Sequence, residues 1–409
     1  METDDVLGAP YERHTIDLGS DDEGPVVATL VRRRSDTPTR RAVLYVHGFV
    51  DYFFQTHLAD FFVQRGWDFY ALDLRKYGRS LRDYQTPNFC RSLTEYFPEL
   101  DEAARIIRTE DGHDQMLVAG HSTGGLITSL WSHARRDVGL VDGLFLNSPF
   151  FDFNVSWLMR RPILGTLTVM SRRTPYRILP MSTLGLYGQS LHADHSGEWT
   201  YDLRWKPLLG FPVRFGWLEG IQRAQRRLRR GLSIGAPVLV ACSTRTFRGK
   251  TWTEDVRITD SVLDVAHIVR WAPMLGPRVT IARFDGGMHD LTLSGKEVRA
   301  EVFRELGRWL DAYVPAPGTP EVEVPPAPED KTAPDNPAPD KAQPDNAAPH
   351  KAPPDGAPPD NAPPDNAPPD NAAPDRAAPE DGTAADRTDT TDGTSDDRTH
   401  ADDKTEATA

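Results

Sequence analysis

The segment from Leu117 to Gly125, Leu-Val-Ala-Gly-His-Ser-Thr-Gly-Gly, constrains the fold more than any other part of the chain. An apolar run leads into Gly120-x-Ser122-x-Gly124, and an amphipathic run from Leu126 to Ala134 follows. This pattern predicts a buried strand, a tight turn that carries the serine above the end of a sheet, and a helix. The glycines leave room for the turn, where a Cβ would clash. The N–H groups of the helix N-terminus would stabilise negative charge beside the serine.

A serine hydroxyl becomes a nucleophile when a base removes its proton, and the base needs an acid to orient it. The best candidate for the base is His289, which follows an expected strand through a loop with two glycines. Three aspartates are candidates for the acid: Asp255, Asp260 and Asp264. We favour Asp260, which stands just ahead of an expected helix. Each of the other two is then expected to be an N-cap or a first-turn carboxylate of a helix.

An oxyanion that forms during acyl transfer needs two N–H donors. The residue after the serine, Thr123, supplies one expected donor. The sequence His47-Gly48-Phe49 follows another expected buried strand, and the backbone N–H of Phe49 is the second. We expect His47 to brace this loop, and His121 to point sideways from the serine turn.

Short apolar runs alternate with helical patterns along residues 1–314, which predicts one α/β domain with a mostly parallel sheet. The expected strands are 15–18, 26–32, 42–46, 68–72, 115–119, 141–146, 237–241 and 279–284. The expected helices are 57–65, 96–108, 126–134, 262–272 and 297–313. The alternation stops between about 150 and 235, which we interpret as an inserted cap. Ligands of such sheets bind at the carboxyl ends of the strands, where His47, Ser122 and His289 are expected.

Residues from about 14 to 313 resemble the α/β-hydrolases of the monoacylglycerol lipase and serine-aminopeptidase-like (lysophospholipase-like) group. The matching motifs are His47-Gly48-Phe49, 73–80 (Asp-Leu-Arg-Lys-Tyr-Gly-Arg-Ser), 120–124 (Gly-His-Ser-Thr-Gly), 260–264 (Asp-Ser-Val-Leu-Asp) and 287–289 (Gly-Met-His). The resemblance implies an α/β-hydrolase fold with a mobile cap, no cofactor and no metal. It also implies a triad of Ser122, Asp260 and His289, in the chain order of that fold. One departure is the long stretch 242–259 between the strand and the expected acid.

The chain changes character at residue 315. From there on it has no Phe, Tyr or Trp and holds 21 of the 35 prolines, with 22 acidic and 7 basic side chains. Low hydrophobicity and high charge predict a disordered tail over 315–409. A unit Ala-Pro-Pro-Asp-Asn repeats around 357–372 and favours extended, polyproline-like backbone. Such a tail is either a solvated spacer or an arm that binds a basic partner.

The net charge of the whole chain is −13 at pH 7. It comes from this tail, because residues 1–314 carry 40 basic and 38 acidic side chains. A nearly neutral domain argues against nucleic-acid binding. Two cysteines, Cys90 and Cys242, fit a reducing compartment. The acidic start is no signal peptide, and no apolar run approaches the length of a membrane span. We therefore expect a cytoplasmic protein.

The cap and nearby loops should choose the substrate. Tyr52 and Phe53 follow the oxyanion turn and either wall an acyl pocket or belong to the core. The cap adds several apolar side chains that suit an acyl chain: Trp157, Leu158, Met159, Trp199, Trp205 and Trp217. Five arginines between Ile221 and Arg230 form either a solvated helix face or a transient contact with an anionic membrane surface.

Together these features predict a serine hydrolase that cleaves a carboxylic ester, in particular a small lipid ester such as a monoacylglycerol or lysophospholipid. An amidase or a C–C bond hydrolase would use the same three side chains. The alternative from another class is a non-catalytic hydrolase-like protein whose tail binds partners.

Overall fold

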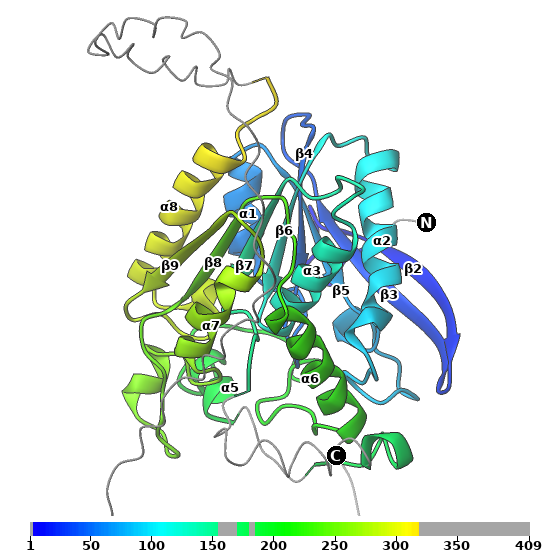
Figure 1. Cartoon of the computed structure of the whole chain (residues 1–409), viewed down its shortest axis with the longest axis vertical. Coiled ribbons are helices and arrows are strands. Elements are labelled where there is room, and N and C mark those ends of the chain that lie inside the picture. The colour runs from blue at the N-terminus through cyan, green and yellow to red at the C-terminus, as the bar shows by residue number, and fades with distance from the viewer. Residues whose placement is uncertain (1–2, 154–169, 180–184, 319–409) are drawn as a thin grey trace, which may run out of the picture. The chain divides into compact units, whose positions relative to one another are not determined.

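A single nine-stranded sheet organises the computed structural model, which describes residues 3–153, 170–179 and 185–318 (Figure 1). The strands are β1 (Thr3–Asp4), β2 (Glu12–Asp21), β3 (Gly24–Arg33), β4 (Arg41–Val46), β5 (Asp68–Asp73), β6 (Gln115–His121), β7 (Gly143–Asn147), β8 (Val238–Ser243) and β9 (Val279–Phe284). Their order is β1-β2-β3-β5-β4-β6-β7-β8-β9. The pairs from β1 to β5 are antiparallel, and all pairs from β5 to β9 are parallel. The predicted mostly parallel sheet is confirmed.

Helices cover both faces of the parallel part of the sheet. They are α1 (Thr56–Gln64), α2 (Phe97–Arg105), α3 (Thr123–Ala134), α5 (Gly185–Leu191), α6 (Phe215–Arg229), α7 (Val265–Trp271) and α8 (Lys296–Tyr313). Apolar side chains of α1 and α8 pack on one face, where Val43 and Tyr45 of β4 point. Those of α2, α3, α6 and α7 pack on the other face with Leu44 and Val46. Because successive side chains of a strand alternate, β4 is buried on both faces and reads as an unbroken apolar run.

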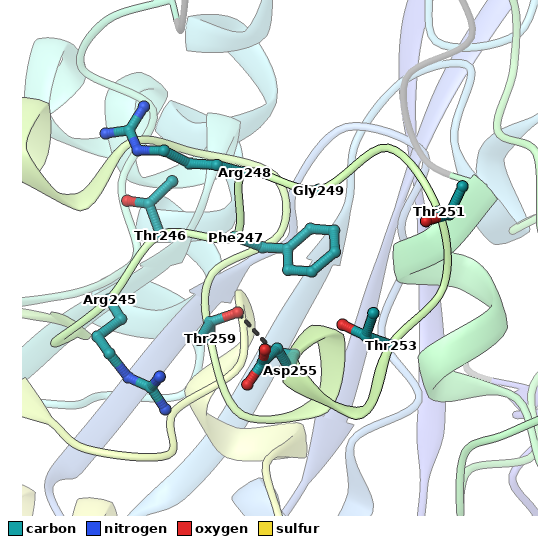
Figure 2. A pocket seen from close by; sticks show the side chains of 9 residues that line it. All are labelled: Arg245, Thr246, Phe247, Arg248, Gly249, Thr251, Thr253, Asp255 and Thr259. Atoms are coloured by element: carbon teal, nitrogen blue, oxygen red, sulfur yellow. Dashed lines mark hydrogen bonds between the residues drawn. The ribbon is translucent and has the colours of Figure 1, made fainter.

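The loop between β8 and α7 leaves the sheet and returns close to where it left. Thr246 and Asp260 pair as a short parallel bridge, and the N–H of Asp260 donates to the carbonyl of Arg245 at 2.9 Å. The excursion between them lines an open cavity of about 320 Å³, shown in Figure 2. The unusual stretch after β8 is therefore a closed surface loop, and Asp260 still lies near the end of its strand.

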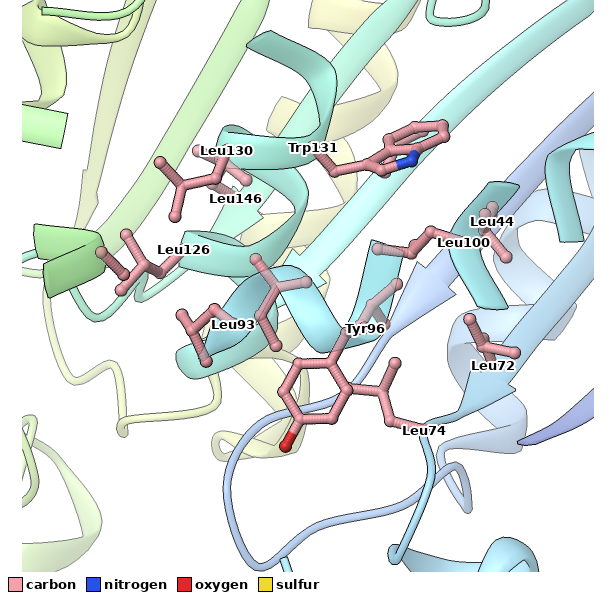
Figure 3. Packing of buried hydrophobic residues seen from close by; sticks show 14 of the residues in the cluster. Leu44, Leu72, Leu74, Leu93, Tyr96, Leu100, Leu126, Leu130, Trp131 and Leu146 are labelled. Atoms are coloured by element: carbon pink, nitrogen blue, oxygen red, sulfur yellow. The ribbon is translucent and has the colours of Figure 1, made fainter. Parts of the chain in front are cut away.

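Helix α3 lies at the centre of the larger core, part of which is drawn in Figure 3. Its residues from Thr123 to Ser132 are all buried, including Leu126, Leu130 and Trp131. The amphipathic character predicted for this helix is therefore wrong: α3 has α2 and α6 as neighbours in the same core as well as the sheet. That burial fixes the first turn of α3, where Thr123 stands.

All the predicted strands and helices within the described residues are present, with bounds within about three residues of those expected. The helix expected at 262–272 begins only at Val265, because Asp264 is its N-cap and accepts a hydrogen bond from the N–H of Ala266. The backbone of the domain also continues past 314, since Gln115 donates to the carbonyl of Pro315 at 2.9 Å.

Among the described residues, no helix combines the length and the apolar character that crossing a membrane requires. The predicted disordered tail lies outside the described residues from position 319 onward. The cap residues Trp157, Leu158 and Met159 lie outside them as well.

Candidate active site

Ser122 stands on a strained turn between β6 and α3. Its φ and ψ angles are 52° and −115°, a conformation that residues with a side chain rarely adopt. The surrounding backbone holds it there: the N–H of Ser122 donates to the carbonyl of Asn147 at 2.9 Å, and its own carbonyl accepts from Phe150 at 2.9 Å. This is the geometry of a nucleophile elbow.

The two glycines of the motif are required by close contacts. A Cβ at Gly120 would lie 2.6 Å from Oγ1 of Thr128, and one at Gly124 would lie 2.3 Å from the carbonyl oxygen of His47. The second contact is with residues 47–51, the loop expected to hold an oxyanion donor, which is called the oxyanion loop from here on. The predicted need for glycine is confirmed at both positions, and at Gly124 it also lets the start of α3 approach that loop.

The structure brings Ser122, His289 and Asp260 together. The Nε2 atom of His289 lies 3.0 Å from Oγ of Ser122, and its Nδ1 atom lies 3.0 Å from Oδ2 of Asp260. The exposed fractions of the three residues are 7%, 3% and 0%. With its proton on Nδ1, the imidazole donates to the carboxylate and presents a lone pair to the serine hydroxyl. This arrangement can move a proton from Ser122 to His289 while Asp260 holds the ring in place.

The other two aspartates considered for the acid lie elsewhere. Asp264 caps α7 and pairs with Arg248 at 3.0 Å, and Asp255 is exposed on the loop of Figure 2. Asp260 is oriented by two backbone donors, because its Oδ1 accepts from the N–H groups of Val262 and Leu263 at 2.9 and 2.8 Å. Only its Oδ2 then faces the histidine.

The oxyanion loop lies against the serine turn. A Cβ at Gly48 would be 3.1 Å from the Cβ of Ser122, so this backbone passes the serine closely. Thr123 is the first residue of α3, and its N–H therefore has no partner within the helix. His47 braces the loop as expected, since its Nε2 accepts from the N–H of Leu74 at 3.1 Å. The ring of Phe49 packs on Trp217 of α6 at 4.2 Å between centroids.

Tyr52 and Phe53 differ from each other in their surroundings. Phe53 is fully buried in the core under α1 and packs on Phe69 at 5.1 Å, so of the two places considered for it the core is confirmed and the wall of an acyl pocket is wrong. The alternation of side chains turns it to the far side of the loop. Tyr52 faces the cap, where its hydroxyl accepts from the N–H of Asp202 at 2.7 Å and its ring contacts Trp205.

Beneath the three side chains lies a buried group that sequence reasoning missed, the charged cluster of Asp51, His121, Lys206 and Asp290. Nδ1 of His121 lies 3.3 Å from Oδ2 of Asp51 and 4.0 Å from Oδ2 of Asp290. Nζ of Lys206 lies 2.7 Å from Oδ1 of Asp51. Asp51, His121 and Asp290 are each next to a predicted site residue in the sequence, and Lys206 lies in the cap. This position in the sequence was the one signal that could have pointed to the cluster.

The charges of the cluster reinforce one another. Burial alone would raise the pKa of Asp51, but the Lys206 ammonium and His121 hold that pKa well below its usual range. Burial alone would lower the pKa of His121, but Asp290 and Asp51 outweigh it and raise that pKa. The side chains of Asp51, His121 and Asp290 have the donor atoms of a metal site, yet the ammonium of Lys206 already lies against Asp51. The arrangement thus sets one ammonium and one imidazole against two carboxylates.

The arginine run of the cap lies on α6 and just beyond its end. Arg223, Arg226, Arg227 and Arg230 are exposed and spaced to form one stripe, whereas Arg229 turns inward to Asp152. Contact of this stripe with a membrane stays a prediction. It can be tested by substitution, because these four arginines are exposed.

The sheet, the helices on both of its faces and the serine turn define this chain as an α/β hydrolase. It belongs to the serine aminopeptidase S33 family, whose model matches residues 37–246. A comparison with curated protein sequences finds no match.

Solved structures of the same fold are similar over most of the chain. A monoglyceride lipase from Saccharomyces cerevisiae has a TM-score of 0.56 and 16% identity, over 73% of this chain and 94% of that one. A monoacylglycerol lipase from Paleococcus ferrophilus has a TM-score of 0.51 and 21% identity, over 69% and 99%. A carboxyl esterase from Bacillus coagulans, solved with glycerol, has a TM-score of 0.51 and 12% identity, over 74% and 99%. At these identities the likeness shows the fold.

Proposed function

We propose that this chain is a serine hydrolase that cleaves carboxylic esters through an acyl-enzyme on Ser122. The observation that carries the proposal is the unbroken chain of contacts from Oγ of Ser122 through both ring nitrogens of His289 to Asp260, each 3.0 Å long. A buried carboxylate that orients a histidine toward a serine on a strained turn is the arrangement that activates a hydroxyl for attack.

In the proposed reaction His289 takes the proton of Ser122 as Oγ attacks the ester carbonyl. The N–H groups of Phe49 and Thr123 then donate to the oxyanion. The partial positive charge at the N-terminus of α3 stabilises it further. His289 returns the proton to the leaving alcohol and the acyl-enzyme forms. Water, deprotonated by the same histidine, releases the acid and restores Ser122.

We further propose that the ester is a small lipid ester, such as a monoacylglycerol or lysophospholipid. The enclosure of the site supports an apolar substrate: Ser122 is 7% exposed, and the ring of Tyr187 from the cap lies 5.4 Å from that of His289. Phe49 and Trp217 add an aromatic pair where the oxyanion loop meets the cap. The monoglyceride lipases among the structural neighbours are consistent with this class. The peptidase name of the family is not taken as an activity.

A fluorophosphonate probe tests the mechanism, because it reacts covalently with an activated serine. Wild type should be labelled at Ser122 in a peptide map, and Ser122→Ala should fold normally and stay unlabelled. Absence of labelling in folded wild type would instead support a non-catalytic hydrolase-like protein.

A panel of substrates tests the specificity. p-Nitrophenyl esters of increasing chain length measure the acyl site, and a monoacylglycerol, a lysophospholipid and a matched anilide distinguish lipid esterase from amidase. Faster turnover of the anilide than of every ester would contradict the ester assignment while leaving the serine mechanism intact. A labelled protein that cleaves none of these compounds would point to a C–C bond hydrolase.

A further inference from the structure

Lys206 carries a buried charge from the cap into the base of the candidate site. Its side chain is 7% exposed, and besides Asp51 its Nζ lies 3.5 Å from the carbonyl oxygen of Val50. Three aromatic rings surround the ammonium at 5.7 to 5.9 Å from their centroids, those of Phe54, Tyr187 and Tyr201. A buried cation so enclosed is held by the cap and by the oxyanion loop together.

The carboxylate that Lys206 pairs with belongs to the oxyanion loop. Asp51 follows Phe49 by two positions, and its second oxygen contacts Nδ1 of His121, the residue directly before Ser122. One side chain thus connects the cap to the loop of the proposed oxyanion donor and to the serine turn.

The cluster reaches the proposed base from its other end. Asp290 directly follows His289, and it is fixed by Nδ2 of Asn147 at 2.7 Å and by the N–H of Thr292 at 3.0 Å. Its Oδ2 accepts from Nε2 of Gln55 at 3.3 Å and faces His121. The rings of His121 and His289 lie 5.0 Å apart. The oxyanion loop, the serine turn and the His289 loop therefore all adjoin the same cluster of four side chains.

Withdrawal of Lys206 would leave this cluster unbalanced. A buried charge is tolerated only where it is paired, and removing one partner of a buried pair leaves the other uncompensated. Without the ammonium, two carboxylates would share a single histidine. Asp51 would then either take up a proton or turn toward water, and either change alters the contacts that hold the oxyanion loop. The charges of the cluster are therefore balanced only while the cap holds Lys206 against Asp51.

We propose that Lys206 is a positioning residue that couples the seating of the cap to the geometry of the oxyanion loop and of the His289 loop. This inference rests on the proposed function, since it assigns a role to the cap in the same site. A cap that only covers the substrate would change binding, whereas a cap that sets the oxyanion donors changes the rate of the chemical step.

The first test compares Lys206→Met with Arg204→Met, a matched change two residues away in the same segment. The side chain of Arg204 is 83% exposed and pairs with Asp202 at the surface. A displacement of about 1 Å in an active site can cost about 100-fold in rate. We expect Lys206→Met to slow fluorophosphonate labelling and kcat for p-nitrophenyl acetate about 10- to 100-fold with little change in KM. Arg204→Met should match wild type.

The acetate ester is chosen because so short an acyl group can make few contacts with the cap, so a loss of substrate binding by the cap should have little effect on its turnover. Wild-type kcat in folded Lys206→Met, or a change confined to KM, would overturn the proposal. If Lys206→Met does not fold, the double variant Lys206→Met with Asp51→Asn replaces it, because that variant leaves neither charge unpaired. The double variant should fold and still be slow, and wild-type labelling in it would overturn the coupling.

Amide hydrogen exchange gives a readout that needs no activity. In the variant that folds, exchange should become faster in residues 47–54 and 285–294, while β2 and β3 keep their wild-type rates. Unchanged exchange in both loops would overturn the coupling whatever the activity shows. If wild type is never labelled by the probe but the exchange responds as expected, the proposed function fails and the coupling stands.

Discussion

The imidazole of His289 reaches Ser122 across 167 positions of the chain, with Nε2 3.0 Å from Oγ, because β6 and β9 end at the same edge of the parallel part of the sheet. Neither side chain depends on the other for its place. The strained turn before α3 fixes Ser122, and the loop after β9 fixes His289. A substitution at one of them should therefore leave the position of the other unchanged, so the effect of each single variant can be interpreted separately.

The acid assignment predicts a sharp contrast between two neighbouring aspartates. Asp260→Asn should lower kcat for ester hydrolysis about 10⁴-fold, because an asparagine favours the wrong tautomer of the histidine. Asp264→Asn should keep nearly wild-type kcat and nearly wild-type stability, because asparagine caps a helix N-terminus about as well as aspartate does. Steady-state kinetics and urea unfolding of both variants check this. A crippled Asp264→Asn with an active Asp260→Asn would contradict the assignment.

The glycine before α3 predicts a loss of stability. In Gly124→Ala the new Cβ would lie 2.3 and 2.4 Å from the carbonyl oxygens of His47 and Val46, and neither backbone can move away cheaply. Overpacking of this kind costs about 1–3 kcal/mol or more, so the midpoint of urea unfolding should fall clearly. Gly235→Ala is the matched control, since a Cβ there meets no atom within 4 Å. Equal midpoints for the two variants would contradict the close approach.

Features of the fold and the site that depend on neighbouring residues could be predicted from the sequence. Features that depend on contacts between residues far apart in the chain could not. The strands were predictable because each buried strand is an unbroken apolar run, and the serine turn because its glycines are local requirements. The choice among Asp255, Asp260 and Asp264 needed the pairing of Thr246 with Asp260, a contact across a closed loop. Such pairing leaves no periodic trace in the sequence.

The charged cluster shows the same limit more strongly. Lys206 lies in a cap segment without regular alternation, and its partner Asp51 is 155 positions away. The sequence left the place of Phe53 open for a related reason: its neighbours in the sequence face the cap, while its own ring enters the core under α1. Side-chain direction in an irregular loop is set by tertiary packing rather than by a repeating pattern.

His121 predicts a pH dependence of stability. Asp290 and Asp51 raise its pKa in the folded protein against the opposing effect of burial, and Lys206 is the other charged side chain of the cluster. A raised histidine pKa contributes stability that is fully present below about 6.5, the unfolded value, and is lost as the pH rises through the folded value. The difference in the free energy of unfolding between wild type and His121→Gln should therefore be larger at pH 6 than at pH 9.

His133→Gln is the control for this trend. Burial and the nearby Arg227 lower the pKa of His133, so its contribution should change with pH in the opposite direction. Urea unfolding of the three proteins at both pH values gives the comparison. A difference for His121→Gln that is equal at pH 6 and pH 9 would contradict the raised pKa of His121.

The composition after residue 315 predicts that the acidic tail is separable from the domain. Truncation after Gly318 should leave the melting temperature and ester hydrolysis unchanged, because a segment so poor in apolar side chains buries little surface. Truncation after Ala312 is the contrasting variant, since it removes the buried Val314, whose carbonyl accepts from Arg41 at 3.0 Å. Calorimetry should show a lower melting temperature for this shorter protein alone. A marked drop for both would mean that the tail packs on the domain.

The arginine stripe at α6 predicts binding to anionic membranes. The arginines are themselves exposed, and Arg223 pairs with the half-buried Glu219 one helical turn away at 3.4 Å, a contact that holds a charge only weakly. An arginine near an anionic leaflet contributes about 1 kcal/mol, so changing Arg223 and Arg227 to Gln should weaken binding to phosphatidylserine vesicles more than about tenfold. The matched control changes Arg304 and Arg308 of α8, also exposed and four positions apart, and should bind like wild type. Flotation with phosphatidylserine and phosphatidylcholine vesicles measures both. Equal recovery of wild type with the two lipids would show that the stripe is a solvated helix face.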